Sequence, residues 1–375
     1  MLSWLEIDSL RFRKNVEGFR GILAPGVLVM VVVKANAYGH GLRELATIAA
    51  EVGDWLGVNS SDEALALTTS GIRKPIAILG HSEVDQAETI VREGYRQVVY
   101  RSDVAQALSK AAQRLSRPAR IHLKIETGTN RQGLSLSELD GFLKLVRNLP
   151  GLEIEGVYTH FANIEDTLDP SFAHLQLERF KKATSLMEAG GIRPAQVHAA
   201  ASSGALLYPE TAFTMIRLGI GAYGIWPSRE TQLAARERGR QITLSPVLSW
   251  KTRVVQVKQV APGDYVGYGL TYQASRTMRV GVLPIGYYDG YDRQLSNAGR
   301  VLVRSQFAPV VGRIAMNMTM IDVTDIPAEN DDEVVLIGRQ GGQEIRAEEL
   351  SEKSGTIAYE FLSRINPLIS RVIKT

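Results

Sequence analysis

The 375-residue sequence predicts an α/β fold in which a (β/α)8 barrel is followed by a mostly β-strand domain. A chain of this length exceeds what one hydrophobic core usually fills, so two domains are expected. Apolar runs alternate with helical patterns over the first two-thirds, and this pattern changes after the charged stretch 229–240. We therefore expect the barrel to span residues 1–237 and the β domain to span residues 238–375, with residues 1–8 pairing with the β domain.

Eight short apolar runs have the length and composition of buried strands. They are residues 27–33, 55–58, 75–79, 97–100, 120–125, 152–159, 195–199 and 214–218. Each is followed by a helical or helix-like stretch, and eight such repeats are the count of a (β/α)8 barrel. An open doubly wound sheet remains the alternative, although no Gly-x-Gly-x-x-Gly follows the first strand to support a dinucleotide fold.

The stretches between these strands have the apolar spacing of amphipathic helices. They are residues 42–52, 62–70, 82–93, 103–115, 136–148 and 174–189. Asp62, Ser82 and Asp103 are the expected N-caps of three of them, and several end close to a glycine, as helices commonly do.

Short strands separated by Pro- and Gly-containing turns predict the β domain. The expected strands are residues 247–258, 279–283, 299–303, 307–311, 318–323 and 333–337. Two helices, at 347–353 and near 357–365, are expected to follow them.

The composition excludes several classes of function. The 43 basic and 40 acidic residues give a net charge of only +3, with no like-charged run, which argues against nucleic acid as a partner. The absence of cysteine excludes disulfides, thiolate catalysis and cysteine-ligated metals, and no metal site is predicted. The N-terminus carries acidic Glu6 and Asp8 rather than the features of a signal peptide, and no apolar run has a membrane-spanning length of ~18 residues. We expect a cytoplasmic enzyme.

Lys34 is the most informative residue, because it ends an apolar, β-branched strand and opens the segment Lys-Ala-Asn-Ala-Tyr-Gly-His-Gly. Loss of hydration favours the neutral amine of a lysine, and a neutral amine can attack a carbonyl to form a Schiff base. A strand-end lysine whose side chain reaches back into water is the alternative interpretation. The compact loop that follows favours a functional site, because such a loop is costly to order.

Other reactive side chains lie where the predicted strands end, which is the face that carries active sites in such barrels. They are Lys34, Lys124, Glu126, Arg131, His160, His198, Ser202, Ser203 and Arg217. A single strand-end histidine is more often a structural hydrogen-bonding group than a catalyst. The convergence of side chains from five strand ends on one mouth predicts an active site.

A phosphate site is expected after strands seven and eight, because these loops bind phosphate in many barrels through hydroxyls and backbone N–H groups. Ser202, Ser203 and the turn at Gly219 to Gly221 supply such groups, although each is an ordinary loop feature when taken singly. A phosphate site beside a Schiff-base lysine predicts pyridoxal 5'-phosphate (PLP) as the cofactor.

The chain resembles the alanine racemases, which are fold type III PLP enzymes, over nearly its whole length and including the β domain. The motifs that carry this resemblance lie at residues 33–41, 127–131, 160–162, 217–220, 266–269, 284–287 and 311–313 with Met316. The resemblance implies that Lys34 holds PLP and that Arg217 hydrogen-bonds the pyridine nitrogen. It further implies contacts with the phosphate from Tyr38, Ser202, Gly219, Ile220 and Tyr359.

The same resemblance implies a two-base racemisation of alanine. Lys34 would serve the face of the α-proton of the D-enantiomer, and Tyr268 of the partner subunit would serve the opposite face. Inversion at the α-carbon needs an acid/base on each side, and His160 and Arg217 would favour the phenolate of the tyrosine. The substrate would contact Arg131, Met316, Tyr268 and Tyr287. A head-to-tail homodimer is implied, because the β domain supplies the catalytic tyrosine.

Several positions depart from the pattern of the family. Ala201 stands where asparagine is usual, and Ser203 leaves the phosphate-binding serine ambiguous between Ser202 and Ser203. Asn317 replaces the usual aspartate, which removes a negative charge beside the substrate, and Thr129-Asn130 replaces Met-Gly. Lys124 matches a lysine that some members carry carbamylated, where it would anchor the arginine of the carboxylate site.

Tyr359 is expected either to pack an interface or to narrow the mouth of the site beside Tyr268. Together with Tyr287, the second role would favour alanine over larger substrates. A serine or broad-specificity racemase of the same fold remains an alternative. A fold type III decarboxylase and a catalytically silent PLP-binding barrel are more distant ones. Supply of D-alanine for peptidoglycan is implied by the resemblance alone.

Overall fold

The computed structural model describes all 375 residues, which form two compact units. The barrel unit consists of residues 12–35 and 46–245. The β-domain unit consists of residues 1–11, 36–45 and 246–375. The segment directly after Lys34 therefore groups with the β domain, although it lies in the barrel part of the sequence.

Eight parallel strands form the sheet of the barrel unit, in the order β8-β7-β6-β5-β4-β3-β2-β9. Their bounds are β2 (Leu28–Val32), β3 (Trp55–Val58), β4 (Ile76–Ile78), β5 (Arg96–Val99), β6 (Ala119–Lys124), β7 (Leu152–Tyr158), β8 (Gln196–His198) and β9 (Met215–Leu218). The eight predicted strands are confirmed, and each bound lies within one residue of its expected place. Two backbone hydrogen bonds of 3.0 Å, from Thr214 to Val197 and from Arg217 to Ala200, join the last two strands. The sheet is thus a nearly closed barrel and not an open doubly wound sheet.

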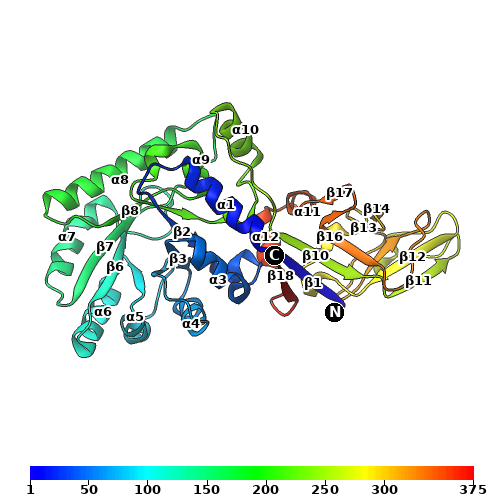
Figure 1. The fold of residues 1–375 in the computed structure, drawn as a ribbon, viewed down its shortest axis with the longest axis horizontal. Coiled ribbons are helices and arrows are strands. Elements are labelled where there is room, and N and C mark those ends of the chain that lie inside the picture. The colour runs from blue at the N-terminus through cyan, green and yellow to red at the C-terminus, as the bar shows by residue number, and fades with distance from the viewer. The chain divides into compact units, whose positions relative to one another are not determined.

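Helices lie between successive strands and surround the sheet (Figure 1). They are α1 (Ser9–Ile22), α3 (Leu42–Val52), α4 (Ser61–Thr69), α5 (Ala87–Glu93), α6 (Ser102–Leu115), α7 (Leu136–Arg147), α8 (Ser171–Ala189) and α10 (Arg229–Glu237). The expected N-caps are wrong. Ser60 caps α4 through its hydroxyl, and Arg101 occupies the N-cap position of α6. Both helices therefore begin before the aspartates, Asp62 and Asp103, that were expected to cap them.

The β-domain unit contains two sheets. The larger has the order β14-β13-β16-β10-β1-β18, with β17 paired to β16, and the smaller has the order β11-β12-β15. The strands of the larger sheet are β1 (Ser3–Asp8), β10 (Leu248–Arg253), β13 (Arg300–Val303), β14 (Gln306–Pro309), β16 (Glu333–Gln340), β17 (Gln343–Ile345) and β18 (Ser370–Lys374). Those of the smaller are β11 (Gln256–Val260), β12 (Met278–Leu283) and β15 (Thr319–Asp322). N-terminal β1 lies between β10, which is antiparallel to it, and C-terminal β18, which is parallel.

The expected single strand at 247–258 is wrong, because the chain changes sheets there. The Val254 N–H donates to Asp332 O at 3.0 Å, whereas the Val255 N–H donates to Val282 O at 2.9 Å. The backbone therefore leaves the large sheet at Val254 and enters the small one at Val255. The expected helices are confirmed as α11 (Ala347–Lys353) and α12 (Ala358–Ser363).

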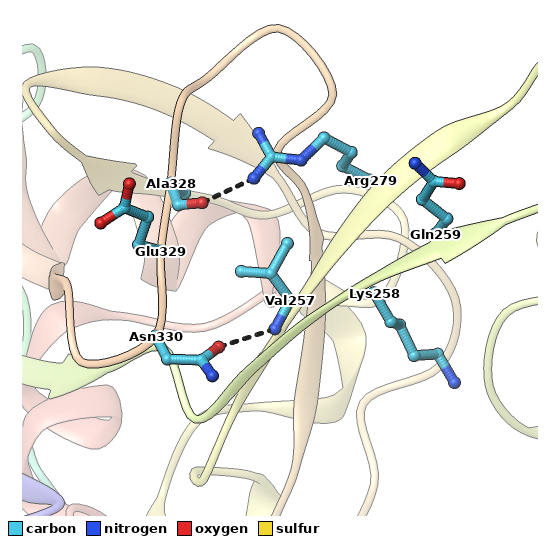
Figure 2. Close-up of a pocket in the computed structure, with 7 residues that line it drawn as sticks. All are labelled: Val257, Lys258, Gln259, Arg279, Ala328, Glu329 and Asn330. Carbon is cyan, nitrogen blue, oxygen red and sulfur yellow. Dashed lines mark hydrogen bonds between the residues drawn. The ribbon is translucent and has the colours of Figure 1, made fainter.

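An open surface pocket lies on the β domain, at β11, β12 and the loop before β16 (Figure 2). Arg279 donates to Ala328 O at 2.7 Å, and Asn330 accepts the Val257 N–H at 3.0 Å, so these polar groups hold the loop against the sheet. None of the predicted site residues lines this pocket. No helix of the chain has both the length and the apolar character that crossing a membrane requires.

Candidate active site

The segment after β2 turns with a left-handed backbone. The φ angles of Ala35, Asn36, Ala37 and Tyr38 lie between +52° and +53°, so α2 (Lys34–Tyr38) is a left-handed turn built without glycine. Each non-glycine residue in this conformation costs roughly 1–2 kcal/mol. The Asn36 side chain accepts the Leu42 N–H at 2.8 Å and so ties the end of the turn. Strain of this kind persists where surrounding structure imposes it, and it clusters at functional sites.

Lys34 lies in a cationic environment at the end of β2. Burial lowers the pKa of its ammonium group, and the charges of Arg131 and Arg217 lower it further, while Glu63 opposes them. Glu63 also accepts the Ala35 N–H at 2.7 Å, which fixes the backbone beside the lysine. Burial and the two arginine charges favour the neutral amine of Lys34, which is the form that reacts with a carbonyl.

Lys124, at the end of β6, is perturbed in the same way. Burial, together with the positive charges of Arg131 and Arg217, lowers its pKa to about 7. Its Nζ lies 5.3 Å from the ring centroid of Tyr158 on the neighbouring strand β7. The neutral amine of this lysine is therefore far more accessible than that of an ordinary lysine.

Arg217, on β9, is buried and held by several acceptors. One terminal nitrogen, Nη1, donates to His198 Nδ1 at 2.9 Å and to His198 O at 3.1 Å. The other, Nη2, lies 2.8 Å from Thr159 O, 2.9 Å from Ala199 O and 3.1 Å from His160 Nδ1. Its guanidinium also stacks over the Tyr158 ring at 5.0 Å. The structure thus fixes both the position and the plane of this buried cation.

The loop that carries Arg131 is organised by the carboxylate of Glu126. This carboxylate accepts the Gly128 N–H at 2.6 Å, the Arg131 N–H at 3.2 Å and the Thr129 hydroxyl at 3.0 Å. Burial raises the pKa of Glu126, but the hydrogen bonds outweigh it and the net shift is downward. Thr129, one of the departures from the family pattern, thereby has a local role in holding this loop.

Replacing Glu126 by alanine is expected to loosen this loop. Because hydrogen bonds to a charged group are among the stronger ones, amide hydrogen exchange at Gly128 and Arg131 should accelerate by about tenfold or more. The folded-state pKa of Glu126 is lowered, so the protection should be full at neutral pH and lost as the pH falls through that lowered pKa. Glu138→Ala is the control, because Glu138 accepts the Ser135 N–H at the start of α7. Equal exchange at Gly128 in wild type and Glu126→Ala would contradict this role.

The two serines after β8 have different partners. Both lie at the start of α9 (Ser202–Leu207) and are buried. The Ser202 hydroxyl accepts the N–H of Gly221, a residue of the 3-10 helix η3 (Ile220–Tyr223), at 3.3 Å. The Ser203 hydroxyl instead donates to Glu165 at 2.8 Å. Ser202 is therefore the serine whose hydroxyl contacts the turn after β9.

The remaining predicted residues lie in the β-domain unit. Tyr38 and Tyr359 approach each other, with ring centroids 6.2 Å apart. The backbone segments that carry Tyr287 and Met316 are adjacent, because the Tyr287 N–H donates to Ala315 O at 3.1 Å. Tyr268 is 73% exposed, and Met316 and Tyr287 are exposed as well.

Two residues that the sequence did not single out support the site. Gln176 of α8 is buried, donates to the Thr127 hydroxyl at 3.1 Å and to His160 O at 3.3 Å, and accepts the Ala162 N–H at 2.8 Å. It ties the loops after β6 and β7 together. His122 is buried in β6 and contacts His198. Because alternate residues of a strand point to the same face, the position of His122 two residues before Lys124 predicts that both side chains lie on one face. The sequence therefore held a signal for this residue.

Family models for the two domains of alanine racemases match most of the chain. The model described as "Alanine racemase, N-terminal domain" matches residues 7–227, and that described as "Alanine racemase, C-terminal domain" matches residues 247–373. The chain is 41% identical to an alanine racemase of Symbiobacterium thermophilum over 371 residues, which are 98% of this chain and 96% of that protein.

Solved structures resemble the whole chain. The alanine racemase of Bacillus anthracis with bound L-Ala-P has a TM-score of 0.92 and 34% identity, covering 100% of this chain and 95% of that one. A histidine racemase from Leuconostoc mesenteroides has a TM-score of 0.89 and 28% identity, covering 100% of this chain and 98% of that one. The fold is thus shared by racemases of more than one amino acid.

Proposed function

The chain belongs to the alanine racemase family of isomerases, and from this premise we propose that it interconverts L-alanine and D-alanine by a PLP-dependent two-base reaction. The observation that carries the proposal is the arrangement of strand ends in the barrel. The environment of Lys34 favours its neutral amine, the guanidinium of Arg217 is held in place on the adjacent strand β9, and the Ser202 hydroxyl contacts the Gly221 N–H in the turn after β9.

The side chains of the barrel unit fit PLP. An aldehyde would react with the Lys34 amine, and Ser202, Gly219 and Ile220 would take the phosphate, with Tyr38 and Tyr359 contributing their hydroxyls. When bound, PLP supplies an electron sink for the bonds of the substrate α-carbon. Arg217 would donate a hydrogen bond to the pyridine nitrogen but no proton. This would limit the electron sink and disfavour decarboxylation and transamination.

Arg131 and the backbone N–H of Met316 are proposed to bind the carboxylate of the substrate. The low pKa of Lys124 makes its neutral amine available for carbamylation, and a carbamate there would give Arg131 a negative partner. Lys34 would remove or return the α-proton on one face, and Tyr268 would do so on the other. Burial and the charge of Arg217 hold the pKa of His160 well below its usual range, so its ring is neutral, and the positive charge that would favour the phenolate of Tyr268 comes from Arg217.

The high exposure of Tyr268 supports a head-to-tail homodimer. A catalytic phenol needs a site with little water, so we propose that the Tyr268 of one subunit completes the site of its partner, with Tyr287 beside it. The cytoplasmic location and the supply of D-alanine to peptidoglycan that the resemblance implies belong to this proposal as well.

Chiral analysis of the PLP-loaded protein in deuterated water tests the function. L-alanine, L-serine, L-lysine and L-histidine are supplied separately, the last because a histidine racemase shares the fold. We expect alanine to convert fastest, with deuterium entering the α-carbon. Faster conversion of serine, lysine or histidine would contradict alanine as the substrate, and formation of an amine with release of CO2 would contradict racemisation.

A further inference from the structure

A line of buried polar side chains runs from Arg217 across the barrel unit to Glu155. His198 Nδ1 lies 2.9 Å from Arg217 Nη1, and His198 Nε2 lies 3.0 Å from His122 Nδ1. His122 Nε2 lies 3.7 Å from Glu155 Oε2. Both histidines are fully buried, and their rings stand at 62° with centroids 5.2 Å apart.

The available donors and acceptors allow only one direction of hydrogen-bond donation along this line, from Arg217 toward Glu155. A guanidinium has only donors, so His198 Nδ1 must accept. A neutral imidazole then carries its proton on Nε2, which donates to His122 Nδ1. By the same reasoning the proton of His122 lies on Nε2 and points toward Glu155. The last distance exceeds that of a normal hydrogen bond, so the carboxylate acts on this N–H through its charge.

The charges agree with that direction. Burial lowers the pKa of His198, and the neighbouring Arg217 lowers it further, while burial also dominates the lowered pKa of His122. At the outer end, burial raises the pKa of the Glu155 carboxyl, but the nearby His122 N–H and the two hydrogen bonds and charge of Arg96 outweigh it and lower this pKa to about 2. The line thus runs from the cation of Arg217, through the neutral rings of His198 and His122, to the anion of Glu155.

The barrel also makes room for the line. Gly156 faces His122 from the paired strand β7, and a Cβ there would lie 2.6 Å from the His122 ring. Tyr158 stacks flat on His198, with an interplanar angle of 4° and centroids 4.9 Å apart. Trp55 packs on His122 at 5.5 Å. Each ring is therefore locked in the plane that its hydrogen bonds require.

We propose that Glu155, His122 and His198 are positioning residues that act as a directed relay, holding Arg217 in one orientation and supplying a negative end to its buried charge. The relay rests on the proposed function in one respect, namely that Arg217 binds the pyridine nitrogen of PLP. It carries no proton to the site, because arginine does not give up its own. Its effect is to keep the guanidinium donors in one orientation while other cations lie close by at the barrel mouth.

The first test reads the histidine tautomers directly. The PLP-loaded enzyme is labelled with ¹⁵N-histidine, and long-range ¹H–¹⁵N correlation identifies the protonated nitrogen of His122 and His198, assigned by loss of signals in the variants below. We expect both rings to be neutral and protonated on Nε2. A proton on Nδ1 of either ring, or a cationic ring at neutral pH, would overturn the proposal whether or not the enzyme racemises alanine.

The second test separates the relay from general stability. His122→Asn offers a carbonyl oxygen close to the place of Nδ1, whereas His122→Leu offers none. We expect His122→Leu to change the His198 tautomer signal and to lower kcat/KM by up to about tenfold, the upper size of one hydrogen bond between neutral groups. His122→Asn should restore most of both. Equal behaviour of the two variants would refute the relay.

The outer end has a matched control on the same strand. Glu153 and Glu155 both lie on β7 and both pair with an arginine, Glu153 with Arg120 at 3.2 Å and Glu155 with Arg96 at 2.8 Å. Only Glu155 faces His122. Glu155→Gln should shift the ¹⁵N signals of His122 and His198 and lower kcat/KM, and Glu153→Gln should change neither. If Glu155→Gln leaves the histidine signals in place, the carboxylate is not part of the relay.

Discussion

Lys34→Ala is expected to lose essentially all racemase activity, by at least about 10⁴-fold, together with the visible absorbance of the lysine–cofactor linkage. The variant removes both the amine that reacts with the cofactor and the proton-transfer group on one face of the substrate, and proton transfer alone contributes about 10²- to 10⁴-fold. Chiral assays and absorbance spectra of PLP-reconstituted protein measure the two effects together.

A surface lysine gives the control for this variant. Lys110 lies exposed on α6, and Lys110→Ala should keep both the activity and the spectrum. If Lys34→Ala retained the linkage absorbance while Lys110→Ala lost it, the assignment of the cofactor lysine would be wrong.

Tyr268→Phe is expected to lower racemisation by about 10²- to 10⁴-fold, since it removes the proposed acid/base on the second face. The Lys34 absorbance should stay intact, because Tyr268 takes no part in that linkage. Exchange of the α-proton of D-alanine with deuterated solvent, the exchange assigned to Lys34, should persist without inversion. Chiral chromatography and NMR of the recovered alanine measure inversion and exchange separately.

Tyr265→Phe is the matched control, because Tyr265 precedes Tyr268 in the same segment and is also exposed. It should leave both inversion and exchange unchanged. Unchanged inversion in Tyr268→Phe would remove the two-base proposal while leaving the family and the fold in place.

The order of elements in the barrel is predictable from sequence because each part has a local signal. The run of β-branched residues at 27–33 and the alternating apolar residues at 120–125 predict strands, and the helices between the strands have the 3.6-residue period. Local signals fail where two interactions compete for the same backbone. Val254 and Val255 both suit a strand, but hydrogen bonding to Asp332 and Val282 divides them between two sheets. The expected cap of α4 failed because Ser60, two residues before Asp62, accepts the Glu63 N–H through its hydroxyl.

The reactive side chains at the strand ends of the barrel, among them Lys34, His160 and Arg217, follow from the sequence alone, because the carboxyl ends of parallel strands lie on one face. How these groups are charged and oriented depends on contacts that form only in the folded chain. Burial among like charges favours the neutral amines of Lys34 and Lys124, and the left-handed turn at 35–38 is imposed by its surroundings. The line from Glu155 through two histidines to Arg217 joins four strands, and contacts between residues so far apart in the chain leave no local pattern to read.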